Sequence, residues 1–541
     1  MKSPDFHSRR SPVYGRGGVV AASQPLAVAA GIEILLKGGN AADASVATAA
    51  ALNVTEPTST GIGGDMFALF FDAATKQVSA VNGSGRAPAA LTLERLKKEG
   101  LKELPPYHAY TVTVPGACAG WCDLIEKHGT RTMAEILAPA LHLAEEGFPV
   151  GQLTSYFWSR GVERQLRSAP NGLEMTINGH APGAGEVFKN PGLARTFRKI
   201  AEGGRQAFYQ GEIAEAIAGV IKQAGGCMTG EDLAAHTSTW ETPISVTYRG
   251  YRVYECPPNG QGLTALIALN LLEGFDLGSL DPISAERLHL EIEAMRLAFA
   301  DARWYIADPQ FTQIPVSQLL SKEYAAERRK RMDPRRAVLN QERGVPVASS
   351  DTVYFSVVDK FGNACSFINS NYMGFGTGMV PKGWGFTLQN RGHNFDLDPA
   401  HPNALAPRKR PYHTIIPAMA TCISDDSLFA SFGVMGGFMQ PQGHVQVFSA
   451  LVDGGLDPQA ALDLPRFCID DGTSGGIVAL EEGIANKVIA DLEGRGHPVQ
   501  KVSGWDRALF GRGQVILRDP DTAVLTGGSD PRADGCAVSL I

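Results

Sequence analysis

The sequence predicts an α+β protein, with helices in roughly its first two-thirds and strands in its last third. Apolar residues recur at helical spacing from Ala117 to about Lys330, whereas β-branched and aromatic runs dominate after Ser350. The 61 glycines and 33 prolines follow no fixed period, which is typical of many tight turns between short strands. At 541 residues and 44% hydrophobic composition, the chain is long enough to bury a large core.

The helical part begins near the N-terminus, where we expect residues 20–54 to be helical. The run Pro25 to Leu36 is followed by Gly38-Gly39-Asn40, a signal for a helix end, and then by an alanine-rich stretch. A glycine loop then leads into an apolar strand, Met66 to Phe71. Further amphipathic helices and one hairpin, turned by Arg249-Gly250, are expected at Thr132–Glu146, Gly211–Gln223, Ala285–Tyr305 and Ile244–Tyr248 with Tyr251–Tyr254.

The strand-rich part follows a polar segment, Met332 to Ser350, which has no periodicity and is predicted to be an exposed linker. The residues from Thr352 to Asp359 and from Asn363 to Ser370 are two apolar runs around a turn that contains Gly362. This pattern strongly predicts a β-hairpin. More strands are predicted at Ala418–Ile423, Phe429–Gly433, Ile477–Leu480 and Val515–Arg518.

Composition and the absence of several motifs restrict the partners that we expect. The formal net charge of −7 disfavours binding to nucleic acids or to anionic membranes, which require clustered Lys and Arg. The eight cysteines form no C-x-x-C pair, and no phosphate-binding, dinucleotide-binding or metal-binding motif is complete, so we expect no metal and no cofactor. The first residues lack the apolar core of a secretion signal, which predicts a cytoplasmic protein.

Thr352 is the leading candidate for a catalytic residue. A threonine can act as a nucleophile when its own free α-amine serves as the base. In mid-chain this amine exists only after the Asp351–Thr352 peptide bond is cut, and the polar linker suits such a cut. The products would be chains 1–351 and 352–541. From spacing alone, the alternative is a β-branched residue that merely opens a strand.

The hairpin register offers a second candidate, Ser370. If the strands pair symmetrically about Phe361, then Ser370 lies directly opposite Thr352, with about 5 Å between the Cβ atoms. A bulge at Gly362 would shift this register by one residue. Gly436-Gly437 follows an apolar run and offers two adjacent N–H groups for a developing oxyanion, although glycine pairs also form plain turns.

These residues carry a resemblance to a known protein family. The stretch from Asp351 to Ala364 resembles the start of the small subunit in the γ-glutamyltranspeptidase (glutathione hydrolase) family. The resemblance covers nearly the whole chain and includes Gly38 to Ala44, Glu56-Pro57, Gly61 to Gly64, Val114-Pro115-Gly116, Gly230 to Leu233, Tyr248 to Tyr251, Phe375 to Gly378, Lys409-Arg410-Pro411 and Ser529 to Arg532.

The resemblance implies an N-terminal-nucleophile hydrolase with a four-layer αββα sandwich. It implies one precursor that cuts itself into a large chain, 1–351, and a small chain, 352–541, intertwined in one structural domain and able to form a dimer of such heterodimers. Thr352 would attack a small-molecule amide and form an acyl-enzyme that water or an acceptor amine releases. Ser370 matches a hydroxyl that contacts the nucleophile, and Gly436 with Gly437 match the oxyanion-binding glycines.

The substrate pocket departs from the family pattern. The arginine that grips the glutamyl carboxylate aligns with Ser84, and Arg86 stands two residues later. Arg391 favours a carboxylate, whereas Asn394 replaces an acid that pairs with the substrate amine. The substrate is therefore either a γ-glutamyl compound or another small carboxylated amide such as oxamate, and the non-enzymatic alternative is an unprocessed, inactive member. The remaining substrate contacts fall on Tyr372, His413 and Thr414.

Overall fold

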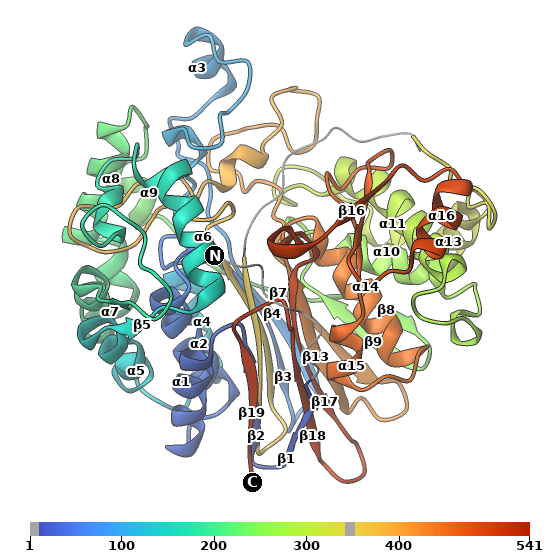
Figure 1. The fold of residues 1–541 in the computed structure, drawn as a ribbon. Coiled ribbons are helices and arrows are strands. Elements are labelled where there is room, and N and C mark those ends of the chain that lie inside the picture. The colour runs from blue at the N-terminus through green and yellow to red at the C-terminus, as the bar shows by residue number, and fades with distance from the viewer. Residues whose placement is uncertain (1–9, 341–351) are drawn as a thin grey trace.

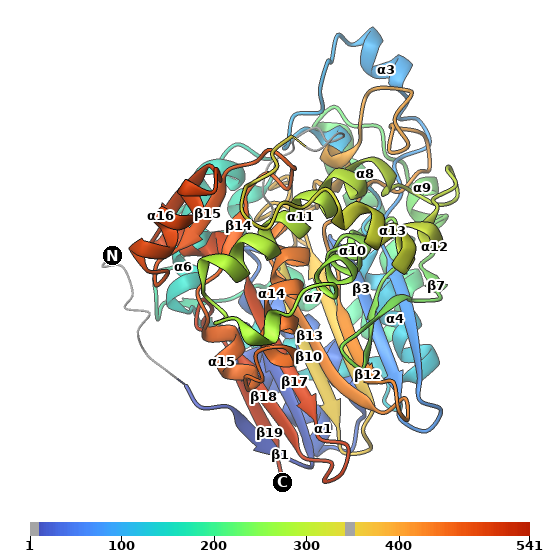
Figure 2. The same ribbon diagram turned by 90° about the vertical axis from the view of Figure 1, so that its right-hand side faces the viewer.

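Two seven-stranded antiparallel sheets lie face to face between two layers of helices in the computed structural model, which describes residues 10–340 and 352–541 (Figures 1 and 2). One apolar core lies between the sheets and one lies between each sheet and its helices. This arrangement confirms the predicted α+β class and the four-layer sandwich.

The first sheet runs in the order β1 (Val13–Gly15), β18 (Leu525–Ser529), β17 (Arg512–Arg518), β13 (Leu428–Met435), β12 (Ala418–Cys422), β9 (Tyr251–Glu255), β8 (Ile244–Tyr248). The second runs β19 (Cys536–Leu540), β2 (Gly18–Ala22), β10 (Val353–Asp359), β11 (Ala364–Ser370), β3 (Asp65–Asp72), β4 (Gln77–Gly83), β7 (Thr239–Glu241). Both sheets mix strands from before and after residue 352. Neither segment can therefore complete either sheet by itself.

The helices form two separate layers. Those covering the second sheet are α1 (Pro25–Leu36), α2 (Ala41–Thr55), α4 (Ala117–His128), α5 (Met133–Glu146) and α7 (Pro191–Tyr209). Those covering the first sheet are α10 (Gly262–Leu272), α11 (Ala285–Tyr305), α14 (Met439–Val452) and α15 (Pro458–Asp463). None of the helices in the described ranges combines the length and the apolar character needed to cross a bilayer.

Shorter elements lie outside these layers. The remaining helices are α3 (Leu93–Lys98), α6 (Gln152–Gly161), α8 (Glu212–Gln223), α9 (Gly230–Ala234), α12 (Val316–Leu319), α13 (Lys322–Arg329) and α16 (Asn486–Gly494). Two small sheets consist of β5 (Phe148–Pro149) with β6 (Val187–Phe188), and of β14 (Phe467–Ile469), β15 (Val478–Glu481) and β16 (Val499–Val502).

The central hairpin has the predicted register. Val353 pairs with Asn369 and Val358 with Ala364, so the pairing is symmetric about Phe361 and the alternative one-residue shift does not occur. The turn is held by Asp359, whose Oδ1 accepts hydrogen bonds from the N–H groups of Phe361 and Asn363. Gly362 has a φ of +87°, which favours glycine at this position.

The start of the chain differs from the prediction. Residues 20–22 are not helical, because Gly18–Ala22 forms β2 and pairs with β10 and β19 inside the second sheet. Five consecutive apolar residues fit a strand buried on both faces as well as they fit a helix. The helix that follows has the predicted bounds, and Asn40 begins α2 through a capping box with Asp43.

The predicted linker is described only in part. Up to Asn340 it runs along the surface of the helical layer, where the Ala337 N–H donates to the Arg495 carbonyl and the Val338 N–H donates to Glu293 Oε2. Residues 341–350 and the predicted cleavage residue Asp351 lie outside the described part of the chain.

Candidate active site

Thr352 immediately precedes β10, and its side chain is completely buried. Its Oγ1 lies 3.1 Å from Ser370 Oγ, as expected from the hairpin register. A second polar neighbour is Gln440 on α14, whose Nε2 lies 3.4 Å from Thr352 Oγ1 and whose Oε1 accepts a hydrogen bond from the Ile416 N–H. The threonine hydroxyl is therefore held between two polar side chains from different layers.

Ser370 ends β11 opposite Asp65, the first residue of β3. Its Oγ accepts hydrogen bonds from the Tyr372 N–H at 2.9 Å and from Arg391 Nη2 at 3.1 Å. A hydroxyl oxygen accepts at most two such bonds, so Ser370 is the better donor in its contact with Thr352. This places the Thr352 oxygen at the end of a hydrogen-bond chain that starts at a guanidinium.

Arg391 is fully buried beside Ser370. Its Nη1 donates to Thr414 Oγ1 at 2.8 Å, and its Nε lies 3.9 Å from Asp65 Oδ2. Burial lowers the pKa of Arg391 to about 10, although Asp65 and Tyr372 oppose this shift, so the guanidinium is protonated at neutral pH. The site thus contains a desolvated positive charge whose two terminal nitrogens contact hydroxyl groups.

His413 links this cluster to the preceding strands. Its Nε2 lies 2.9 Å from Asp65 Oδ2, and its Nδ1 lies 3.0 Å from Asn259 Nδ2. Nδ1 also lies 2.8 Å from the Pro411 carbonyl oxygen. A neutral ring with its proton on Nε2 satisfies the contacts with Asp65 and Asn259, whereas a proton on Nδ1 satisfies the contact with the Pro411 carbonyl. Burial lowers the pKa of His413, which agrees with a neutral ring.

Tyr372 and Asn394 form one wall of the site. Tyr372 has a φ of +79°, which is uncommon for a residue with a side chain, and its ring lies 4.6 Å from the Arg391 guanidinium. Its hydroxyl donates to Asn394 Oδ1 at 2.6 Å, and Asn394 Nδ2 donates to the Tyr412 carbonyl. Burial raises the pKa of Tyr372 to about 12, so it is a neutral donor.

Gly436 and Gly437 follow β13 with φ values of +130° and +60°. Neither of their N–H groups donates a hydrogen bond to another residue in the described part of the chain. Gln261 Nε2 donates to the carbonyls of Gly437 and Thr414, which fixes the glycine turn against the Arg391 side of the site. Gln440, whose N–H donates to the Gly437 carbonyl, connects this turn to Thr352, so these two N–H groups are candidate oxyanion donors.

Arg86 is not joined to this cluster by any contact between described residues. Its Nη1 donates to the Thr237 carbonyl, and its charged neighbours are Asp308 and Glu241. Ser84, two residues earlier, instead contacts Asn259 and so reaches the His413 network. A substrate-binding role for Arg86 stays a prediction that this geometry does not favour.

Sequence reasoning did not select four polar residues of the site: Asp65, Asn259, Gln261 and Gln440. All four are completely buried. Asp65 carries a recognisable signal, because an acid directly before the apolar run Met66 to Phe71 is costly to bury without partners. Gln440 lies three residues beyond Gly437, and only the packing of α14 brings it to Thr352.

One cluster outside the site has side chains that could hold a metal ion. His289 and Glu293 on α11 and His497 before β16 place ligand atoms within 4.8 Å of one another. The two imidazoles already share a 2.8 Å hydrogen bond, and His289 Nε2 faces the Asp333 carbonyl. Hydrogen bonding thus accounts for the position of the two rings, and no contact between described residues joins them to Thr352.

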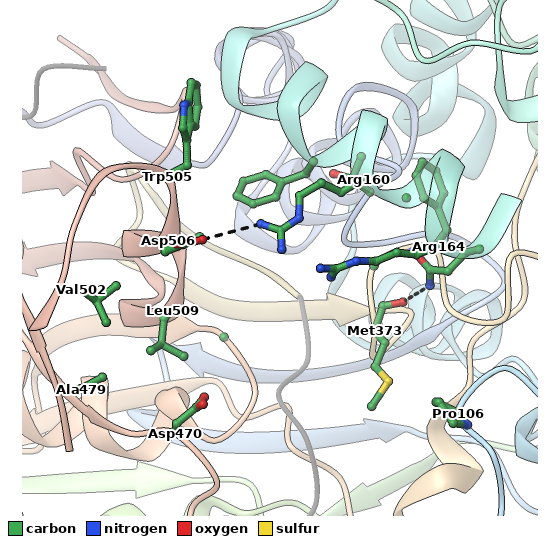
Figure 3. A pocket seen from close by; sticks show the side chains of 18 of the residues that line it. Pro106, Arg160, Arg164, Met373, Asp470, Ala479, Val502, Trp505, Asp506 and Leu509 are labelled. Carbon is green, nitrogen blue, oxygen red and sulfur yellow. Dashed lines mark hydrogen bonds and ion pairs between the residues drawn. The ribbon is translucent and has the colours of Figure 1, made fainter. Parts of the chain in front are cut away.

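A cavity of about 760 Å³ adjoins the cluster (Figure 3). Gly436 lines it directly, and so do Met373 and His393, which neighbour Tyr372 and Asn394 in sequence. The cavity therefore opens on the side of the candidate oxyanion donors rather than on the side of Arg391.

Comparisons with known proteins cover nearly the whole chain. The family model described as Gamma-glutamyltranspeptidase matches residues 27–540. The chain is 38% identical over 538 residues to the glutathione hydrolase-like YwrD proenzyme of Bacillus subtilis, covering 98% of this chain and 99% of that protein. It is 34% identical to the oxamate amidohydrolase proenzyme of Klebsiella pneumoniae, covering 96% and 98%. The crystal structure of cephalosporin acylase from Bacillus halodurans superposes with a TM-score of 0.93 at 47% identity, covering 100% and 99%.

Proposed function

Because the chain belongs to the gamma-glutamyltranspeptidase family, we propose that it is an autoprocessing amide hydrolase whose nucleophile is the Thr352 hydroxyl. The observation that carries this proposal is the buried pair of Thr352 and Ser370 at the start of the central hairpin, with their hydroxyl oxygens 3.1 Å apart. Relatives named as proenzymes support a precursor that is cut into two chains.

The proposed reaction starts when the cut before Thr352 frees its α-amine. The amine takes the hydroxyl proton as Oγ1 attacks the substrate carbonyl carbon, and the Gly436 and Gly437 N–H groups stabilise the resulting oxyanion. Collapse of this intermediate breaks the C–N bond. The leaving amine takes the proton from the Thr352 α-amine, and an ester to Thr352 remains. Water, deprotonated by the α-amine, then releases the carboxylic acid and restores the hydroxyl.

The acyl part of the substrate is proposed to be small and to carry a carboxylate. Arg391 offers a desolvated positive charge next to Ser370, and its Nε, 3.9 Å from the nearest carboxylate oxygen, has no hydrogen-bond partner among the described residues. The wall formed by Tyr372 and Asn394 has no carboxylate for a substrate ammonium group, and the Asn394 amide oxygen already accepts from the Tyr372 hydroxyl. These features favour an oxamate-like or other non-glutamyl acid amide.

A γ-glutamyl compound is the second candidate substrate. The relative named glutathione hydrolase-like favours it, whereas the relatives named for oxamate and for cephalosporins favour other amides. Parallel turnover of γ-glutamyl-p-nitroanilide and oxamate separates the two candidates. Strong turnover of the γ-glutamyl compound would contradict the proposal that the wall formed by Tyr372 and Asn394 does not bind a substrate ammonium group.

Gel electrophoresis tests the nucleophile. The purified protein is expected to give two bands of about 37 and 20 kDa, from the chain mass divided at residue 352, because the amine base exists only after the cut. Thr352→Ala is expected to run as a single band near 58 kDa without activity. An uncut wild-type chain would favour the inactive-member alternative, and two bands from the variant would refute Thr352 as the nucleophile.

A further inference from the structure

The large cavity beside Gly436 differs in character from the buried cluster around Arg391. We propose that this cavity binds the amine half of the substrate, and that Arg164 holds a carboxylate carried by that amine. The proposal rests on the proposed amide hydrolase function and extends it to the leaving group. It defines the substrate class as a small carboxylated acyl group joined to a bulky amine that bears its own carboxylate.

The position of the cavity assigns it to the amine. Arg391, Tyr372 and Thr414 are completely buried, and none of them lines the cavity. The cavity has one wall at Gly436, beside the N–H groups that would hold the carbonyl oxygen. An acyl group bound at Arg391 with its carbonyl at the glycines therefore directs the scissile nitrogen towards the cavity.

The charges of the cavity favour an anion. Its lining carries three cationic side chains, Arg160, Arg164 and Lys501, against two carboxylates, Asp470 and Asp506. Arg160 faces Asp506 across the cavity with 3.9 Å between Nη1 and Oδ1 (Figure 3). Among the described residues no carboxylate forms an ion pair with Arg164. This guanidinium is thus available to a planar carboxylate, which it can bind with two parallel hydrogen bonds.

The turn that carries Arg164 is held in place by the neighbouring residue Gln165. Arg160 lies in the last turn of α6, and Arg164 follows four residues later in a wide helical turn, Val162–Leu166. Both side chains extend into the cavity (Figure 3). Gln165 Nε2 donates to the carbonyls of Met373 and Gly376, which ties this turn to the loop after Tyr372. These bonds fix the backbone that carries Arg164 relative to the loop after Tyr372.

The cavity also offers apolar surface. Phe157 and Trp505 line it, and the Trp505 ring stacks on Tyr156 with 4.4 Å between ring centroids. A volume of about 760 Å³ is in the range of pockets that hold drug-sized ligands, which is far more than an ammonia leaving group occupies. The body of the amine is accordingly expected to be aromatic or otherwise apolar.

Matched substrate pairs test the proposal with the purified, cut enzyme. Oxalyl, malonyl, succinyl, glutaryl and γ-glutamyl groups are each joined to aniline and to 4-aminobenzoate. For the acyl group that is turned over, the 4-aminobenzoate amide is expected to have about tenfold higher kcat/KM, mainly through KM, because a charged hydrogen bond is added. Arg164→Gln is expected to remove this preference and leave the anilide unchanged.

Arg167→Gln is the matched control, since Arg167 lies one turn away, pairs with Glu163 and does not line the cavity. This variant is expected to keep the preference of the wild type. Equal kcat/KM for the two amides in the wild type, or an undiminished preference in Arg164→Gln, would overturn the proposal.

A binding measurement keeps this test separate from the proposed hydrolase function. If no amide of either series is hydrolysed, the proposed function fails, and saturation-transfer NMR with 4-aminobenzoate and aniline still reports on the cavity. Stronger saturation of 4-aminobenzoate that is lost in Arg164→Gln would support the amine site. Equal saturation of the two compounds would refute it.

Discussion

Two clusters of buried charged side chains in this protein differ in how closely their positive and negative groups are paired. The structural cluster consists of Arg466, Glu481, Asp530 and Arg532, and the active-site cluster consists of Asp65, Ser370, Arg391 and His413. In the structural cluster, Arg532 bonds both oxygens of Glu481, at 2.7 and 2.5 Å, and also Asp530 at 3.0 Å. In the active-site cluster, the nearest carboxylate oxygen to Arg391 is 3.9 Å away.

The protonation equilibria of Arg532 and Arg391 reflect this difference: the carboxylates raise the pKa of Arg532 in spite of its burial, whereas burial lowers the pKa of Arg391, as it also does for Arg466. Burial by itself would raise the pKa values of Glu481 and Asp530, but the guanidinium groups outweigh it and lower both values. For Arg391, burial prevails over Asp65 and lowers the pKa to about 10. Ion pairs at hydrogen-bond distance hold the structural cluster together, whereas Arg391, 3.9 Å from its nearest carboxylate oxygen, carries a cost that a substrate carboxylate can offset.

The largest expected effect concerns activity in the active-site cluster. Arg391→Met is expected to lower kcat/KM by about 1000-fold for a carboxylated amide, because truncating one partner of a buried charge pair costs several kcal/mol. The thermal unfolding temperature should change little. If the variant instead unfolds at a lower temperature but retains its kcat/KM, Arg391 has a structural role, and the two clusters do not differ in function.

The counterpart in the structural cluster is Arg532→Met. We expect a loss of about 3–5 kcal/mol of stability, because two buried carboxylates lose their partner. Urea unfolding measures this loss, and Arg532→Lys serves as a second variant that keeps the charge if the first does not fold. The cut and folded fraction should retain near-normal kcat/KM. A large fall in kcat/KM without a fall in stability would contradict the structural role of the cluster that contains Arg532.

Ser370→Ala is expected to have a smaller effect. The variant removes the hydroxyl between Arg391 and Thr352, so we expect kcat to fall by about 10- to 100-fold, as for the loss of one or two hydrogen bonds. Ser370→Thr retains a hydroxyl and should recover most of the activity. Rates of self-cleavage and of turnover, measured separately, show which step uses this contact.

The smallest expected effect is a pH dependence of stability. Asp530 has a lower pKa in the folded protein than its ordinary value of 3.8, so its ion pairs contribute fully above that value. This contribution is lost as the pH falls through the folded-state pKa. The urea midpoint of the wild type should therefore fall more steeply than that of Asp530→Asn below about pH 4. Parallel curves for the two proteins would refute this assignment.

The comparison also separates what the sequence predicted from what it did not. The helix Ala285–Tyr305 and the hairpin about Phe361 follow from periodicity and turn residues, which are local properties. The register placed Ser370 opposite Thr352 because side-chain position in a hairpin is fixed by counting residues from the turn. The strand Gly18–Ala22 was missed, because its partners lie more than 300 residues away.

The sequence by itself determined the family and selected the candidate nucleophile with its hydroxyl neighbour, since each depends on local spacing or on ordered motifs along the chain. Only the tertiary structure decided which charges meet at the site. Asp65, Arg391 and Gln440 come from a strand, a loop and a helix far apart in sequence, and Arg86 lies elsewhere although it is close to Ser84. Long-range packing sets these distances, and an electrostatic contact depends on distance in space rather than on separation along the chain.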